Sequence, residues 1–147
     1  ASAAPWFSSP YGFSKAMSGQ YIQNFHKNFI ICKLPNVYGE KKGKSVVDIF
    51  KGQDEVTIYG TGKNTRTYIH VDDIVEALIM AKDWDKWFEN GEFCLGDGKA
   101  TSVLELAKGK KIKFAPARKE AREAVLDNTT PNWSAKINVF DYLNEKI

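Results

Sequence analysis

Short apolar segments bounded by turn residues recur along this chain and alternate with segments that carry helix signals. The clearest are residues 29–34, 56–59 and 93–95, each followed directly by Pro or Gly. Runs of this length favour buried strands, and strands that alternate with helices favour an α/β fold. The 147 residues, 43% hydrophobic and 27% charged, have the composition of one folded domain or a piece of a larger one. A mainly disordered chain is excluded.

Helix starts are marked by capping residues. Ser9 and Pro10 supply a cap and a first helical position, which predicts a helix to about Lys27. Asp72 and Asp73 precede an apolar helix at 74–81, where their negative charge is favourable, so we interpret this acidic pair as structural. Three further helices are expected: one at 45–50, a short one that opens with a capping box at 102–105, and one near 139–145. The sequence also predicts a turn at 60–62, an extended segment at 65–71 and a strand at 112–115.

Charge and ligand spacing limit the classes of partner. The 21 basic and 18 acidic residues leave a formal charge of +3, which neither demands nor excludes a polyanion. The lysine-rich run at 108–113 has no interleaved aromatic residue apart from Phe114, so a solvated face is favoured and we expect no nucleic acid partner. His26 and His70 have no ligand companions at zinc-site spacing, and we expect no metal.

Hydropathy and cysteine content limit the compartment. No window approaches the roughly 18 apolar residues of a membrane span, and the first ten residues lack a secretory signal pattern, so we expect no membrane partner. Cys32 and Cys94 both lie in apolar stretches, where a buried thiol is commoner than a disulfide. These features predict a reducing, cytoplasmic setting.

Tyr11 and Lys15 are the first candidates for chemistry. On a helix they are one turn apart, with Cβ atoms roughly 5–6 Å from each other. The ammonium charge of Lys15 favours the phenolate of Tyr11, which could then act as a general base or acid. A surface lysine beside a half-buried tyrosine has the same spacing, so the pair alone leaves both interpretations open.

Four separate blocks of sequence together carry a family resemblance. They are YGFSK at 11–15, KLPNVYG at 33–39, TIYGTG at 57–62 and RTYIHVDD at 66–73. In order and spacing they resemble the extended short-chain dehydrogenase/reductases, and more narrowly the NAD-dependent nucleotide-sugar epimerases and dehydratases. The resemblance covers about residues 9–133. It implies the C-terminal part of a Rossmann-type fold together with a smaller α/β substrate-binding lobe.

The resemblance also implies roles in catalysis and cofactor binding. Tyr11 matches the catalytic tyrosine, and Lys15 matches the lysine that favours its ionisation and bonds the nicotinamide ribose. Pro35 matches a position beside the nicotinamide. The implied cofactor is therefore NAD, and the implied reaction begins when Tyr11 removes a proton from a sugar hydroxyl.

Substrate positions follow from the same resemblance. Asn36, Arg66 and Arg118 match residues that hold the diphosphate of the substrate, while Thr57 and Tyr59 match positions that flank the nucleotide base. Guanidinium groups suit this task because they bind phosphate oxygens bidentately. Outside the motif context, Arg66 and Arg118 would be expected to be ordinary solvated or salt-bridged arginines. A uridine diphosphate sugar is the expected ligand.

One expected part of such an enzyme has no counterpart in this sequence. No glycine-rich dinucleotide turn precedes Tyr11, so we expect a fragment or truncated relative that lacks the N-terminal NAD-binding half. Residues 1–52 would form the catalytic-tyrosine helix, a sheet strand and a connection, and residues 53–147 the substrate lobe. Apolar surface left by the missing half predicts self-association, and the resemblance implies a dimer through the first helix. The alternative is a noncatalytic module for nucleotide-sugar or protein binding.

Overall fold

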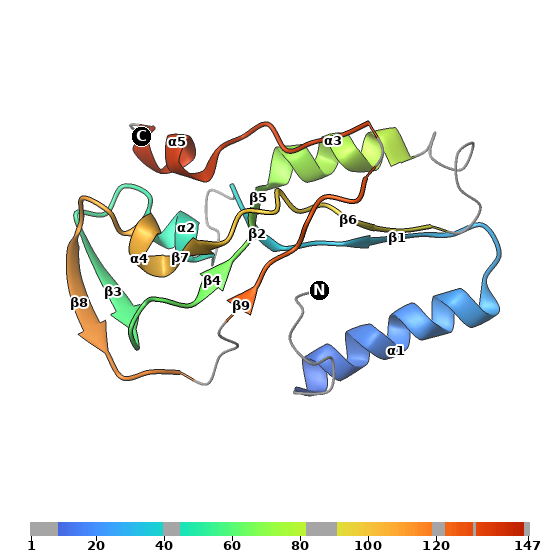
Figure 1. The fold of residues 1–147 in the computed structure, drawn as a ribbon, viewed down its shortest axis with the longest axis horizontal. Coiled ribbons are helices and arrows are strands. Elements are labelled where there is room, and N and C mark those ends of the chain that lie inside the picture. Colours follow the sequence, from blue (N-terminus) through green and yellow to red (C-terminus); the bar gives the residue numbers. More distant parts are fainter. Residues whose placement is uncertain (1–8, 40–44, 82–90, 119–122, 131, 146–147) are drawn as a thin grey trace.

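The chain folds as a mixture of helices and short, mostly parallel strands, which confirms the α/β class (Figure 1). The computed structural model describes residues 9–39, 45–81, 91–118, 123–130 and 132–145. The helices are α1 (Pro10–Phe25), α2 (Val46–Phe50), α3 (Val71–Ala81), α4 (Val103–Leu106) and α5 (Val139–Asn144). The strands are β1 (Ile30–Lys33), β2 (Asn36–Tyr38), β3 (Glu55–Tyr59), β4 (Thr65–Arg66), β5 (Tyr68–His70), β6 (Gly91–Cys94), β7 (Thr101–Ser102), β8 (Lys111–Ala115) and β9 (Glu123–Ala124).

Polar caps set the starts of the helices. Ser9 Oγ accepts a hydrogen bond of 3.0 Å from the Gly12 N–H, and Pro10 occupies the first turn of α1, as the sequence predicts. The predicted capping box is also present, because Glu105 accepts the Ser102 N–H at 2.7 Å while Ser102 Oγ accepts the Glu105 N–H. These local bonds offset the unpaired N–H groups of each first turn.

The strands β1 and β6 form a parallel pair between two helices. Ile30 lies opposite Gly91, and Lys33 lies opposite Cys94. Helices α1 and α3 lie on opposite sides of this pair (Figure 1). A helix thus lies on each side of the parallel pair, as is usual for parallel strands, but α1 buries none of its own residues.

The remaining elements form a second group beside this sandwich. β3 pairs with β8 in parallel, β2 pairs with β5, and β4 lies between β7 and β9. The helices α2 and α4 lie beside the β3–β8 pair (Figure 1), and α5 packs on α2 and β5. Two apolar clusters result, one around Ile58, Leu106 and Val47, the other around Ile69, Leu95 and Phe93. Both clusters draw residues from either side of position 52, and the division of the chain there stays a prediction.

Strand β2, like the two-residue strands β7 and β9, is an element that the sequence interpretation did not anticipate. Pro35 ends β1 as expected, because it has no N–H to continue a ladder. The chain then resumes pairing with a different partner: the Asn36 N–H donates to the Thr67 carbonyl at 3.1 Å, and β2 runs parallel to β5. The sequence interpretation assigns no strand to residues 36–38, and the structure adds this one.

The predicted structural role of the acidic pair is confirmed for Asp73. Its carboxylate is 2% exposed and accepts the backbone N–H groups of Lys136 and Ile137 at 3.1 and 3.0 Å. Asp72 is exposed, and its own N–H donates to His70 Nδ1 at 3.2 Å. Asp73 thus ties α3 to the segment that leads into α5.

Two general features bear on the kind of site to expect. Among the described residues, no helix is long and apolar enough to cross a membrane, and no group of three His, Cys, Asp or Glu side chains could hold a metal ion. Cys32 and Cys94 are free thiols and are partly rather than fully buried. Burial raises the pKa of the Cys32 thiol.

Candidate functional site

A pocket of about 860 Å³ lies between β3, β4, α2 and the start of β2. Its lining includes all five residues that the sequence assigns to the substrate: Asn36, Thr57, Tyr59, Arg66 and Arg118. The rest of the lining is largely apolar. These side chains come from segments far apart in the sequence, so the fold alone brings them together.

The strand register explains how the polar side of the pocket is assembled. Along β3, Val56 and Ile58 point into the core at 5% and 1% exposure, which leaves Thr57 and Tyr59 on the open face. Asn36 lies opposite Tyr68 in the β2–β5 ladder. Tyr68 is two residues after Arg66, so Asn36 and Arg66 lie near each other. Arg66 is partly buried, and its Nη1 donates to the Thr65 carbonyl at 2.7 Å. The side chains of two strands and a strand start therefore share one cavity.

The described residues that line the pocket carry a net positive charge. Among them, Arg66 and Arg118 are cations, and the carboxylate of Glu55 forms an ion pair of 2.6 Å with Lys113. A guanidinium has five N–H donors in a planar fork and stays protonated. The arrangement can bind an anion with several oxygens, such as a diphosphate.

Helix α2 forms an apolar wall of the pocket through Val46, Ile49 and Phe50. Its opposite side is fixed by Asp48, which accepts the Gly39 N–H at 2.9 Å and the Tyr142 hydroxyl of α5 at 3.1 Å. Sequence reasoning did not identify this contact. The only local signal was the spacing of Ser45 and Asp48, since Ser45 caps α2 and donates to Asp48. Burial, followed by the bond to Asp48, raises the pKa of Tyr142.

Arg118 and Tyr59 are in direct contact at the edge of the pocket. The guanidinium carbon of Arg118 lies 3.4 Å from the centroid of the Tyr59 ring. This is a close cation–π contact, in which the guanidinium carbon lies over the ring. The sequence predicts that both residues belong to one site, and it contains no sign that they touch.

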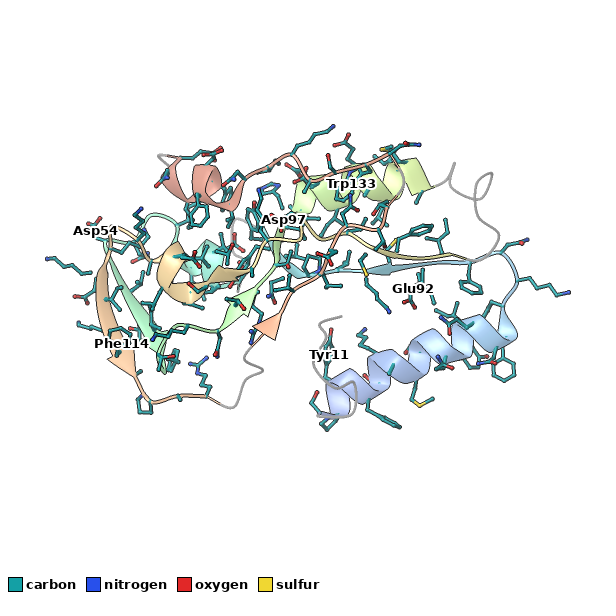
Figure 2. All side chains as sticks on the ribbon, in the orientation of Figure 1. Tyr11, Asp54, Glu92, Asp97, Phe114 and Trp133 are labelled. Carbon is teal, nitrogen blue, oxygen red and sulfur yellow. The ribbon has the colours of Figure 1, made fainter. Side chains whose placement is uncertain are left out.

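Tyr11 and Lys15 lie together, but at a different place from the pocket. Lys15 Nζ is 5.6 Å from the centroid of the Tyr11 ring, in agreement with the predicted one-turn spacing. Tyr11 is 72% exposed at the start of α1, and Figure 2 shows it well apart from the β3–β8 pair, on which Phe114 is labelled. Neither Tyr11, Lys15 nor Pro35 lines the pocket, and their roles stay predictions.

Comparison with protein families gives a direct match. The model of the "NAD dependent epimerase/dehydratase family" matches residues 3–96. A Methanocaldococcus jannaschii protein provisionally assigned as a UDP-glucose 4-epimerase is 37% identical over 111 residues, which are 67% of this chain and 35% of that protein. A dTDP-D-glucose 4,6-dehydratase of Dictyostelium discoideum is 38% identical over 85 residues, which are 50% of this chain and 20% of that protein.

Solved structures agree with the sequence matches. The UDP-glucose 4-epimerase of Thermotoga maritima, solved with UDP-glucose, superposes with a TM-score of 0.77 and 29% identity. The match covers 92% of this chain and 51% of the epimerase chain. The chain thus spans about half of that structure, and about a third or less of the curated relatives named above.

Proposed function

Because the chain belongs to the NAD-dependent epimerase/dehydratase family, we propose that it carries the nucleotide-sugar-binding part of such an enzyme. The proposed ligand is a uridine diphosphate sugar. One observation carries the proposal: Asn36, Thr57, Tyr59, Arg66 and Arg118, drawn from four distant segments, line one positively charged pocket.

The pocket chemistry suits the two ends of such a ligand. Arg66 and Arg118 would bind the diphosphate, whose two negative charges make charge-assisted hydrogen bonds with guanidinium groups. The Asn36 amide would donate to the same oxygens. Thr57 and Tyr59, on the open face of β3, would lie beside the base. The apolar wall of α2 excludes water and strengthens these charged contacts.

In this proposal Tyr11 moves a proton at its phenolic oxygen, taking it from a sugar hydroxyl, and Lys15 supplies the neighbouring positive charge. NAD, when bound, accepts and returns a hydride. The described residues do not enclose a dinucleotide, because Tyr11 is 72% exposed and Tyr11, Lys15 and Pro35 lie outside the pocket. These three residues would supply only an edge of a cofactor site. We therefore expect little or no turnover from this chain alone.

Self-association is part of the proposal. Phe13, Met17, Tyr21 and Phe25 recur every fourth residue of α1, and their exposed fractions lie between 45% and 73%. A stripe of this kind is stabilised when a second surface covers it, either another copy of the chain or an N-terminal half. The free thiols Cys32 and Cys94, on neighbouring strands, are compatible with a reducing compartment such as the cytoplasm.

Titration of UDP into the purified 147-residue chain tests this function. Arg66→Ala removes one of the two cations of the pocket and should weaken binding at least tenfold, since a charge-assisted contact contributes roughly 1.5–3 kcal/mol. Lys108→Ala removes one positive charge outside the pocket and should leave the affinity unchanged. Equal affinities of Arg66→Ala and the unmodified chain would contradict the proposal.

A noncatalytic binding module is the second candidate, favoured by the separation of the Tyr11–Lys15 pair from the pocket. Tyr11→Phe distinguishes an enzyme from a binding module when the chain is combined with an N-terminal half from a relative. For an enzyme, turnover is lost while UDP affinity is retained. For a binding module, no turnover exists to lose and the affinity is again unchanged.

A further inference from the structure

The contact between Tyr59 and Arg118 raises the question of what the tyrosine ring does in the pocket. The Arg118 guanidinium carbon lies 3.4 Å from the ring centroid, so one face of the ring is already covered. A nucleotide base cannot stack on that face while Arg118 stays there. Tyr59 is 44% exposed and is not one of the buried residues of the apolar core.

The backbone holds the two residues at this distance. In the β3–β8 ladder Tyr59 lies opposite Ala115, and the Gly60 N–H donates to the Ala115 carbonyl at 2.9 Å. Gly60 has a φ of 69° and sits so close to Ala117 that an added Cβ would lie 3.2 Å from the Ala117 Cβ. Because Gly60 and Ala117 are in close contact, the backbone just before Arg118 runs beside Tyr59. The strand register thus brings the Tyr59 ring and the Arg118 side chain within reach of each other.

Stacking leaves the binding capacity of the arginine intact. A guanidinium uses its flat face for an aromatic ring, whereas its five N–H donors point outward around its edge. Arg118 can therefore remain on Tyr59 and still donate to phosphate oxygens in the pocket. A side chain held in this way loses less conformational freedom on binding than a freely rotating one.

We propose that Tyr59 is a positioning residue for the anionic part of the ligand, acting through Arg118 rather than by contact with the base. The inference rests on the proposed function and revises one contact within it: Thr57 stays beside the base, whereas the Tyr59 ring acts on Arg118. It predicts that the ring contributes equally to the binding of any ligand with a diphosphate, whether or not a base is attached.

Two ligands distinguish positioning of Arg118 from contact with the base, when variants are compared with the unmodified 147-residue chain. UDP carries a base, and inorganic pyrophosphate has none. With Tyr59→Leu, the dissociation constants of both ligands should rise by a similar factor of about two to five, the range of an exposed cation–π contact. Tyr59→Phe keeps the ring and should bind both ligands like the unmodified chain. Phe114→Leu, a matched aromatic change on β8 outside the pocket, should also have no effect.

A double-mutant cycle adds a readout that a purely structural role would not change. In an Arg118→Ala background, Tyr59→Leu should have no further effect on either dissociation constant, because the residue that it positions is gone. Arg118→Lys keeps the charge but loses the planar stack, and should make the affinity insensitive to Tyr59→Leu. If Tyr59→Leu is poorly folded, Tyr59→Met removes the ring in its place, with the same expected results in both backgrounds.

The outcomes separate the inference from the function on which it rests. A rise for UDP without a rise for pyrophosphate would overturn the inference and show a base contact. Additive effects of the two substitutions would also overturn it. An unmodified chain that binds neither ligand would overturn both the inference and the proposed function.

Discussion

Asp73→Asn is the substitution whose effect on stability follows most directly from the structure. The Asp73 carboxylate is 2% exposed and accepts two backbone N–H groups, from Lys136 at 3.1 Å and Ile137 at 3.0 Å. An amide of the same size offers one acceptor oxygen and places its NH₂ group against the second N–H. Hydrogen bonds to a charged group contribute roughly 1.5–3 kcal/mol each, so the expected loss of unfolding free energy is about 3 kcal/mol.

Urea unfolding followed by circular dichroism measures this loss. At about 2.1 cal/mol/K per residue, the same loss should lower the Tm by roughly 10 °C. Asp72→Asn is the matched control, because its side chain is 77% exposed and one residue away. The control should change the unfolding free energy by no more than about 0.5 kcal/mol. Equal effects of the two substitutions would refute the idea that Asp73 anchors the 136–137 segment.

Three further predictions concern titration, thiol reactivity and assembly. Hydrogen bonds from the Ser102 side chain and backbone lower the pKa of Glu105. The stabilising contribution of its carboxylate is therefore present above about pH 4.3 and is lost as the pH falls through the folded-state pKa. In urea unfolding, Glu105→Ala should reduce this loss of stability at acid pH, and a pH profile identical to that of the unmodified chain would refute the reasoning. Because burial raises the pKa of Cys32, its alkylation at pH 8 should be slower than in the urea-unfolded chain, and equal rates would contradict the burial. Met17→Lys should weaken self-association in analytical ultracentrifugation whereas Gln20→Lys on the same helix should not, and no change with either would exclude the α1 stripe.

Much of the fold could be predicted from local sequence, because local interactions decide it. The Ser9–Pro10 start of α1 and the capping box at Ser102 and Glu105 are formed by residues within one turn. Short apolar runs similarly located β1 and β3. Strand β2 was missed because its three residues follow Pro35 directly, and only the partner strand β5 supplies the bonds that make them a strand.

The candidate site was predictable in its membership but not in its contacts. The family resemblance assigned Asn36, Thr57, Tyr59, Arg66 and Arg118 to the substrate, and all five line the pocket. The stack of Arg118 on Tyr59 depends on the β3–β8 register, which pairs segments more than fifty residues apart. No local pattern in the sequence encodes that register.

The bond between Asp48 and Tyr142 has the same origin. It joins α2 to α5, two helices of five and six residues that acquire their arrangement only in the folded core. Burial of Val47 and Leu143 in one cluster holds the helices together, and the hydrogen bond then fixes their orientation. Long-range packing, rather than helix propensity, therefore places the apolar wall of the pocket.

Thermal unfolding of the chain with UDP alone and with NAD alone tests the central claim most directly. A ligand that binds only the folded state stabilises it by RT ln(1 + [L]/Kd), about 2.7 kcal/mol at one hundred times Kd. The account predicts a higher Tm with UDP and an unchanged Tm with NAD, because all five side chains that we propose for the nucleotide-sugar ligand line one pocket, whereas Tyr11 and Lys15, which we propose for the cofactor, lie outside it. A higher Tm with NAD and none with UDP would contradict it.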